Sequence, residues 1–322
     1  MLVGHKKQWE FLRKKFESEK LGHAYLFTGE EQLGKKKLAK EFAKLINCSA
    51  DLENSLKPCG ICKNCKDIEK ENYTDVLMID LKSDKHEIEI SQIREALNFL
   101  SYKSYYGSYK VVIVDGAEKM NTEAQNCFLK TLEEPKGKTI LILISSHPEM
   151  LLSTILSRCQ AIKFYSVNQK EIENYLITVG AKDKMARQLS VFCQRKPGRA
   201  IDLFLNPDKL EKEQETLKEL VKIINSDLAE KFQYTKKINL EDNNLKAILE
   251  ILQEYLRHLL FLKAGASDLV QQDYFPEAVD KIKNYSSVKI KEILKLLEEI
   301  NTQTSLTNAS PKLALEILLM EM

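Results

Sequence analysis

Five short apolar runs in the first half of the chain constrain its fold more than any other feature. They are "AYLFTG" (24–29), "DVLMID" (75–80), "KVVIVDG" (110–116), "TILILISS" (139–146) and "AIKFYS" (161–166). Most are apolar throughout rather than at alternate positions, which is typical of parallel strands buried on both faces. Amphipathic helical patterns separate them, at 5–19, 34–47, 91–102, 121–133 and 149–155. This alternation predicts an α/β domain with a parallel five-stranded sheet built from βαβ units.

The pattern changes near Ser166, after which the sequence shows no convincing strand. Short helical segments follow, and one of them ends at Gly180, as expected for a C-terminal helix cap. "NPDK" (206–209) is a candidate linker. Longer amphipathic helices then occupy 209–226, 243–263, 275–283, 288–302 and 311–321. We therefore expect an α/β domain at 1–166, a small helical domain at 167–207 and a helical bundle at 208–322.

Charge and hydrophobicity argue against two broad classes of protein, although a local basic face remains possible. The net charge is only +2, so no global basic field indicates strong nucleic-acid binding. No stretch approaches the roughly 18 apolar residues of a membrane span. The N-terminal segment "MLVGHKKQWEFLRKK" lacks the apolar core of a signal peptide. We expect a cytoplasmic protein without a membrane partner.

The segment "GEEQLGKKKLAK" (29–40) nearly matches a phosphate-binding loop. Gly29, Gly34 and Lys35 satisfy the pattern G-x-x-x-x-G-K-[ST], but Lys36 stands where a hydroxyl residue is required. A predicted strand precedes the loop and a predicted helix follows it, so backbone N–H groups and the positive helix end would face a phosphate. The simpler alternative is a strand-to-helix turn bounded by glycines.

The parts needed for hydrolysis are incomplete. Magnesium is normally held by the loop hydroxyl and by an acidic residue that ends a later strand, here Asp115. Lys36 removes the hydroxyl, and Gly116 follows Asp115 where many such motors have a glutamate. Glu118 lies too far along the chain to replace that glutamate without a rearranged turn. We expect a degenerate site at Gly29, Gly34, Lys35 and Asp115. Binding of ATP or ADP stays an open question there, and we do not expect hydrolysis.

Four of the seven cysteines are crowded into one segment. Cys48, Cys59, Cys62 and Cys65 have the spacing C-x10-C-x2-C-x2-C. Four thiolates suit a closed tetrahedral zinc site, which would stabilise an insert at 48–65 and leave no open position for catalysis. An iron–sulfur cluster is the alternative, since it also uses short cysteine spacings. The other cysteines lie among apolar residues and are expected to be buried thiols: Cys127, Cys159 and Cys193.

Together these segments resemble the delta-prime subunits of the bacterial DNA polymerase III clamp loader, a clade of the AAA+ superfamily. The resemblance covers most of residues 1–205 and the helical tail only in length and character. It rests on "VGHKKQ", "GHAYLFTG", "CGICKNC", "EISQIREALNFLSYKSYYGSYKVVIVDGAEKMNTEAQNCFLKTLEEP" (89–135) and "LLSTILSRCQ" (151–160). The last two segments are the most specific.

The resemblance implies an architecture and a role. It makes 1–166 an AAA+ P-loop domain with a zinc-binding insert, 167–207 a helical lid and 208–322 a collar that joins a ring. It implies a stator without ATPase activity of its own, whose partners are the gamma or tau and delta subunits. The assembled complex would load the sliding clamp onto primer–template DNA. Arg158, in the triplet "SRC" (157–159), would enter the ATP site of a neighbouring subunit as an arginine finger.

Two details near the expected nucleotide site differ from motor relatives or stay open. "RKPGRA" (195–200) places Gly198 where motor relatives carry a nucleotide-sensing arginine, and it shifts Arg199 by one residue. One residue corresponds to about 100° of helical rotation, so Arg199 would point elsewhere. The sensor-like polar residue after the fourth strand is either Ser145 or Ser146.

Two other functions remain as alternatives. An active clamp-loader ATPase of the gamma or tau type would need an intact loop and an acidic pair at 115–116. A zinc-dependent nucleic-acid-binding regulator would need basic and aromatic side chains around the cysteines. In "KPCGICKNCKDIEKENY" acidic residues offset the lysines.

Overall fold

The structure is a computed structural model that describes residues 2–50, 57–82, 85, 87–106, 109–238, 242–266, 285–306 and 310–322. The chain divides into two compact units. The first comprises Met1–Tyr175 and Arg195–Arg199, and the second Leu176–Gln194 and Ala200–Met322. Among the described helices, none combines the length and apolar character needed to cross a membrane. The sequence-based boundaries near 166 and 207 stay predictions.

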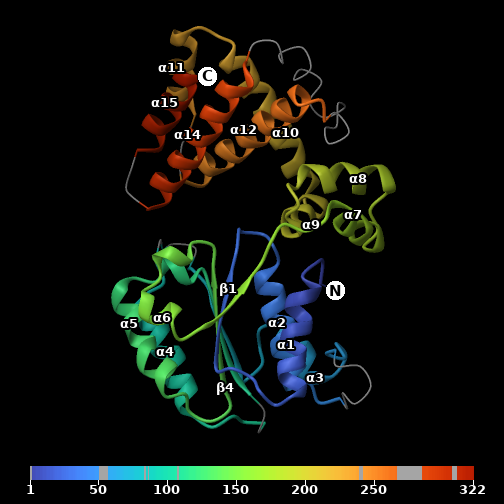
Figure 1. Ribbon diagram of the computed structural model, residues 1–322, viewed down its shortest axis with the longest axis vertical. Helices are drawn as coiled ribbons and strands as arrows, with labels where there is room; N and C mark the ends of the chain where they lie inside the picture. Colours follow the sequence, from blue (N-terminus) through green and yellow to red (C-terminus); the bar gives the residue numbers. More distant parts are fainter. Residues whose placement is uncertain are drawn as a thin grey trace. The chain divides into compact units, whose positions relative to one another are not determined.

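The first unit contains a five-stranded parallel sheet with the strand order β2-β3-β4-β1-β5 (Figure 1). Its strands are β1 (Ala24–Thr28), β2 (Val76–Ile79), β3 (Lys110–Asp115), β4 (Thr139–Ser145) and β5 (Gln160–Lys163). This confirms the predicted fold class. The three central strands are buried almost throughout, whereas β5 at the edge buries only Ile162.

Helices cover both faces of the sheet (Figure 1). One face is covered by α1 (Lys6–Glu17), α2 (Lys35–Asn47) and α3 (Lys63–Glu69). The other is covered by α4 (Ile90–Ser101), α5 (Thr122–Glu133) and α6 (Ser153–Leu156). Successive side chains of a strand point to opposite faces, so Tyr25 and Phe27 pack under the first layer while Ala24 and Leu26 pack under the second. Two apolar layers explain why the strand sequences are apolar throughout.

The carboxyl ends of the strands meet at one edge of the sheet. Thr28 pairs with Ser145, and Asp115 pairs with Ile144. Ile79 pairs with Val114, so Asp80 follows β2 next to the end of β3. In open α/β sheets this edge is where ligands bind.

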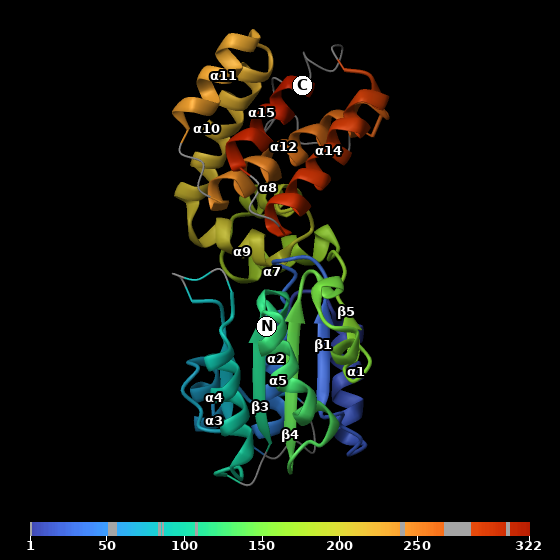
Figure 2. The same cartoon turned by 90° about the vertical axis from the view of Figure 1, so that its left-hand side faces the viewer.

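The remaining helices follow the sheet along the chain. They are α7 (Gln169–Thr178), α8 (Asp183–Phe192), α9 (Pro197–Leu205), α10 (Pro207–Ile224), α11 (Leu228–Lys237), α12 (Asp242–Lys263), α14 (Ser287–Leu306) and α15 (Pro311–Glu321). Within the second unit, α10, α12, α14 and α15 share one apolar core (Figure 2). Leu220, Leu252, Ile290 and Leu315 are fully buried in it. This core is separate from the two layers that cover the sheet.

The structure differs from the predicted helices in three places, the first of which is α3, a helix that was not predicted. Helix α11 was not predicted, although Asp227 caps it by accepting a hydrogen bond from the backbone N–H of Glu230. The predicted helix at 149–155 is instead a 3-10 turn (Pro148–Met150) followed by α6. The predicted helix at 275–283 lies outside the described residues.

Candidate nucleotide, metal and arginine sites

The loop between β1 and α2 has the backbone geometry of a tight glycine turn. Gly29 has φ 140°, and a Cβ there would lie 2.5 Å from the carbonyl oxygen of Phe164. Gly34 has φ 91° and is the N-cap of α2. Both positions favour glycine because other residues rarely adopt these angles. The positive end of α2 therefore lies at the loop, with Lys35 as its first residue.

Lys35 is buried at this edge, with only 6% of its surface exposed. Its Nζ donates to the carbonyl oxygens of Gly29 and Glu30, the latter at 2.6 Å, and to Ser146 Oγ at 3.2 Å. Burial lowers the pKa of Lys35, although the charges of Glu118 and Asp115 act in the opposite direction. The loop lysine is thus close to the acidic groups that follow β3.

Lys36 points toward two carboxylates. Its Nζ lies 2.8 Å from both carboxylate oxygens of Asp80 and 3.8 Å from Asp115 Oδ2. Burial lowers the pKa of Lys36, but the hydrogen bond and charge of Asp80 outweigh it and the net shift is upward. Burial raises the pKa of Asp115, and Lys36 opposes that effect. Sequence analysis missed Asp80, although it ends a predicted strand adjacent to the strand of Asp115.

Glu118 also reaches this edge. Gly116 has φ 74°, and a 3-10 turn (Ala117–Lys119) follows, which brings the side chain back toward β4. Glu118 Oε1 accepts a hydrogen bond from the backbone N–H of Ser146 at 3.2 Å. Glu118 is 9% exposed, and its Oε2 has no hydrogen-bond partner among the described residues. The turn after Gly116 therefore places Glu118 against Ser146, the residue that follows β4.

Of the two candidate sensor serines, Ser146 contacts the loop lysine. Ser145 is fully buried, and its Oγ accepts from the backbone N–H of His147 at 3.1 Å. Ser146 instead accepts from Lys35 and donates to Glu118.

Residues 195–199 contact the loop from the side of α9. The backbone N–H of Gly198 donates to the carbonyl of Gln32 at 2.8 Å, and a Cβ on Gly198 would lie 2.7 Å from that oxygen. Lys196 Nζ lies 3.0 Å from Glu30 Oε2. Arg199 is buried. Lys196, which the sequence analysis did not select, is therefore one basic side chain of this segment that pairs with the loop.

A pocket of about 230 Å³ lies beside the loop. Residues 4–8 line one side, and residues 165–168 with Glu171 line the other. His5 connects the pocket to the loop, since its Nε2 lies 2.7 Å from the carbonyl oxygen of Leu33. Burial lowers the pKa of His5, which favours the neutral imidazole.

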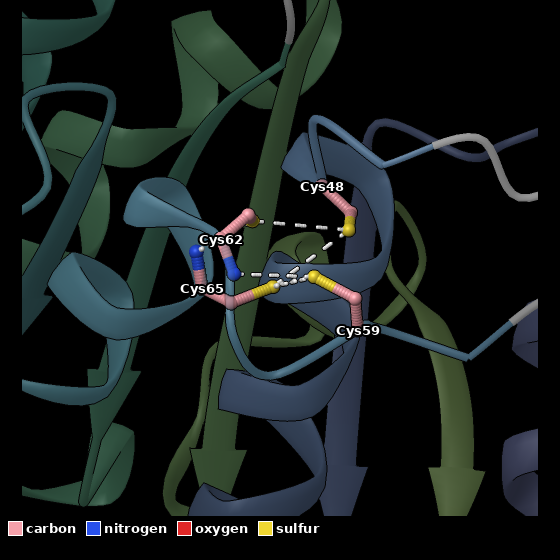
Figure 3. Close-up of side chains that lie close together, drawn as sticks. All are labelled: Cys48, Cys59, Cys62 and Cys65. Atoms are coloured by element: carbon pink, nitrogen blue, oxygen red, sulfur yellow. Dashed lines mark hydrogen bonds between the residues drawn. The ribbon is translucent and has the colours of Figure 1, made fainter.

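The four cysteines of the predicted zinc site lie together (Figure 3). Their sulfur atoms are all within 4.8 Å of one another, and Cys65 Sγ is 3.8 Å from Cys48 Sγ. Tetrahedral Zn–S bonds of about 2.3 Å place sulfurs roughly 3.8 Å apart, so the donor set fits zinc. Cys48 follows α2, and Cys62 is the N-cap of α3. Two neighbouring helix ends therefore hold the cluster.

Backbone and hydroxyl donors point at these sulfurs. The N–H groups of Cys62 and Cys65 donate to Cys59 Sγ and Cys62 Sγ at 3.3 and 3.4 Å. Burial raises the pKa of Cys62, but hydrogen bonds from Ser49 and Cys65 outweigh it and lower the pKa to about 6. A thiolate is the form that binds a metal.

Arg158 lies between α6 and β5, away from the loop along the sequence. Its Nη2 donates to Glu133 Oε1 at 2.6 Å, and its Nη1 donates to the carbonyl of Thr154 at 2.9 Å. The side chain is 34% exposed. Cys159, the next residue, is buried, which raises the pKa of its thiol to about 12.

Residues 4–168 match the family model described as DNA polymerase III, delta subunit. The chain is 31% identical over 271 residues to the DNA polymerase III subunit delta' of Bacillus subtilis, covering 83% of this chain and 80% of that protein. It is 37% identical over 137 residues to the delta' subunit of Pseudomonas aeruginosa, covering 42% and 41%. It is also 36% identical over 193 residues to the tau subunit of Bacillus subtilis, which covers 59% of this chain and 32% of that protein.

Proposed function

The chain belongs to the family of DNA polymerase III delta-prime subunits, and from this premise we propose that it is a clamp-loader stator. In this role it does not hydrolyse ATP. It joins gamma or tau and delta subunits and supplies Arg158 to the ATP site of a neighbouring subunit. The complex then loads the sliding clamp onto primer–template DNA.

The observation that carries the proposal is the position of Lys36. Hydrolysis in P-loop proteins relies on a magnesium ion held near the loop hydroxyl and a strand-end aspartate. In this chain a lysine replaces the hydroxyl residue, and its ammonium is paired with Asp80 and Asp115. An internal cation at that position supports a subunit that is not itself the motor.

The position of Arg158 supports the second half of the proposal. An arginine finger must reach a phosphate outside its own subunit, so its guanidinium needs access to solvent before assembly. Arg158 is partly exposed, and its carboxylate partner Glu133 is 53% exposed. An exposed ion pair is worth about 0–1 kcal/mol, so Arg158 can leave Glu133 at little cost.

Zinc and the helical bundle have structural roles in this proposal. Cys48, Cys59, Cys62 and Cys65 would hold one zinc ion with no open coordination position. The bundle at 208–322 would join the ring, because its core is separate from the sheet layers. A fragment that lacks the bundle should then fail to co-elute with gamma or tau and delta subunits.

One observation favours the ATPase alternative. Glu118 lies close enough to influence Lys35, and its buried Oε2 has no partner among the residues described. A carboxylate in such a place could orient an attacking water, as the missing glutamate at 116 would in a motor.

An ATPase assay on the isolated chain separates the two functions. We expect no turnover above that of Lys35→Ala. Turnover near the roughly 1 s⁻¹ low end for enzymes, abolished by Glu118→Gln, would reject the stator. Glu123→Gln, which changes an exposed carboxylate on α5, is the matched control.

A further inference from the structure

Two carboxylates at the sheet edge share one internal cation. Asp80 follows β2 and Asp115 ends β3, and these strands are neighbours. Lys36 Nζ lies 2.8 Å from both oxygens of Asp80 and 3.8 Å from Asp115. Lys36 is the second residue of α2, directly after the loop lysine.

Magnesium does not fit this arrangement. It prefers hard oxygen ligands in near-ideal octahedral geometry at about 2.1 Å. Here the oxygens of Asp80 already accept from an ammonium, and that positive charge would repel a divalent cation. Lys36 also cannot contribute an oxygen ligand. Magnesium could bind only after Lys36 moves away from both carboxylates.

The phosphate side of the edge keeps the two glycines and the lysine of a phosphate-binding loop. Gly34 begins α2 at the loop, and Lys35 lies within reach of the loop carbonyls. Among the described residues the buried Oε2 of Glu118 has no hydrogen-bond partner, so this edge has room for a further hydrogen-bond donor. Lys196, which faces the loop from residues 195–199, is paired with Glu30.

We propose that Lys36 takes the place of Mg²⁺ at this edge, so that the loop holds the phosphates of a nucleoside diphosphate or triphosphate without a divalent cation. The inference rests on the proposed function in one respect, namely that this chain does not hydrolyse ATP. It adds that the cation of this site is part of the chain.

The charges of the groups that face one another at this edge predict how tightly the unchanged chain and Lys36→Thr bind ADP with and without Mg²⁺. Lys35 and Lys36 face Asp80, Asp115 and Glu118, which leaves one net negative charge with or without magnesium. In Lys36→Thr the same set carries two net negative charges in chelator. Its three carboxylates would be balanced once Mg²⁺ binds to the new hydroxyl and the freed aspartates.

The test is ADP binding to the isolated full chain by calorimetry, in Mg²⁺ and in EDTA. For the unchanged chain we expect dissociation constants that agree within about threefold. Lys36→Thr should bind ADP at least about tenfold more weakly in EDTA than in Mg²⁺, because the phosphates then face uncompensated carboxylates. In Mg²⁺ it should bind more tightly than the unchanged chain.

Two further variants keep the test decisive. Lys37→Thr makes the same change one residue later, where the lysine pairs with Glu69 of α3, and should leave ADP binding unchanged. Asp80→Asn removes one negative charge and should tighten ADP binding equally in Mg²⁺ and in EDTA. A folding failure of Lys36→Thr would therefore leave Asp80→Asn as the measurement.

Three results would overturn the inference. The first is that the unchanged chain binds neither ADP nor ATP, and the second is that it loses this binding in EDTA. The third is that Lys36→Thr binds ADP with the same dissociation constant in Mg²⁺ and in EDTA. Each is measured without partner subunits. Failure here therefore differs from failure of the proposed function, which is measured as ATPase activity of the isolated chain and of the reconstituted complex.

Discussion

The guanidinium of Arg158 and the carboxylate of Glu133 form a hydrogen-bonded ion pair, with Nη2 and Oε1 2.6 Å apart. Glu133 is the last residue of α5, whereas Arg158 follows α6. The pair therefore links the "SRC" triplet to the end of another helix through partly exposed side chains.

Arg158→Ala should leave folding, zinc content and ring assembly of the chain intact. The reconstituted complex should lose ATP hydrolysis at one neighbouring site, because removal of an arginine finger costs about 10³-fold or more there. The loss for the whole complex should be smaller, since other sites keep their own arginines. Steady-state ATPase and clamp-loading assays measure both, with Lys35→Ala in parallel. A larger effect from Lys35→Ala would mean that this subunit acts through its own loop and not through Arg158.

Glu133→Ala should have a mild effect. Since both side chains of the pair are partly exposed, its loss should lower the free energy of unfolding by no more than about 1 kcal/mol. Arg158 keeps its hydrogen bond to the Thr154 carbonyl, so ATPase of the complex should change far less than in Arg158→Ala. Urea denaturation and ATPase assays check this. Equal severity of the two substitutions would make Glu133 a positioning residue for the arginine.

The purified chain should contain one zinc ion, and Cys62→Ser should release it. Cys62 carries the most strongly lowered thiol pKa described in the cluster, at about 6, and caps α3. Elemental analysis gives the stoichiometry, and circular dichroism should show that the sheet persists, because its core does not include the cluster sulfurs. Cys127→Ser, outside the cluster, should retain the metal. An iron–sulfur absorbance band would contradict the zinc assignment.

Gly29→Ala should destabilise the first unit more than Gly34→Ala. Both residues have positive φ, which costs a non-glycine residue about 1–3 kcal/mol. Only at Gly29 does the added Cβ also meet a backbone oxygen, that of Phe164 at 2.5 Å, whereas at Gly34 it meets open space. Urea denaturation of the two variants isolates the clash. If both substitutions lower the free energy of unfolding equally, the backbone at Phe164 moves away from the added Cβ at no cost.

Glu69→Gln should reduce stability at neutral pH but not near pH 2. Burial raises the pKa of Glu69, but hydrogen bonds to Lys37 and Lys44 outweigh it and lower the pKa from 4.5 to about 2. A carboxylate with a depressed folded-state pKa stabilises the fold above its unfolded pKa, and this contribution is lost as pH falls from about 4.5 to 2.

Because Glu69 is 47% exposed, solvent screens the pair and we expect a loss of only about 1 kcal/mol at pH 7. Denaturation in chelator throughout separates this effect from metal release. A difference between Glu69→Gln and the unchanged chain that does not shrink with falling pH would contradict it.

The sheet could be predicted from sequence because its strands are buried on both faces. Continuous runs such as 110–115 and 139–145 have no helical or alternating reading that competes. Helix α11 was harder, because the one residue that it buries fully is Thr235 and no series of buried apolar positions marks it. The aspartate cap at 227 with Glu230 three residues later was the available signal.

The acidic edge could be predicted only in part. Asp115 ends an evident strand, and Asp80 ends another that the sequence alone does not place beside it. Glu118 depends on the left-handed backbone at Gly116, which turns the chain back toward Ser146. Spacing along a sequence does not report such a turn, so the contact of Glu118 with Ser146 could not be predicted.

The lysine-rich start of α2 looks in sequence like a basic patch, but groups within the first unit pair with these lysines. Lys35 donates to loop carbonyls, and Lys36 pairs with Asp80. Lys37 and Lys44 pair with Glu69, the last residue of α3, and Lys40 pairs with Glu71 in the turn that follows. Phosphate backbones attract proteins through uncompensated lysines and arginines that release counterions. A stretch neutralised in this way contributes little outward field. The salt dependence of any DNA contact by the complex should therefore be unaffected by Lys37→Thr or Lys40→Thr, and the charges that meet DNA must lie on other elements.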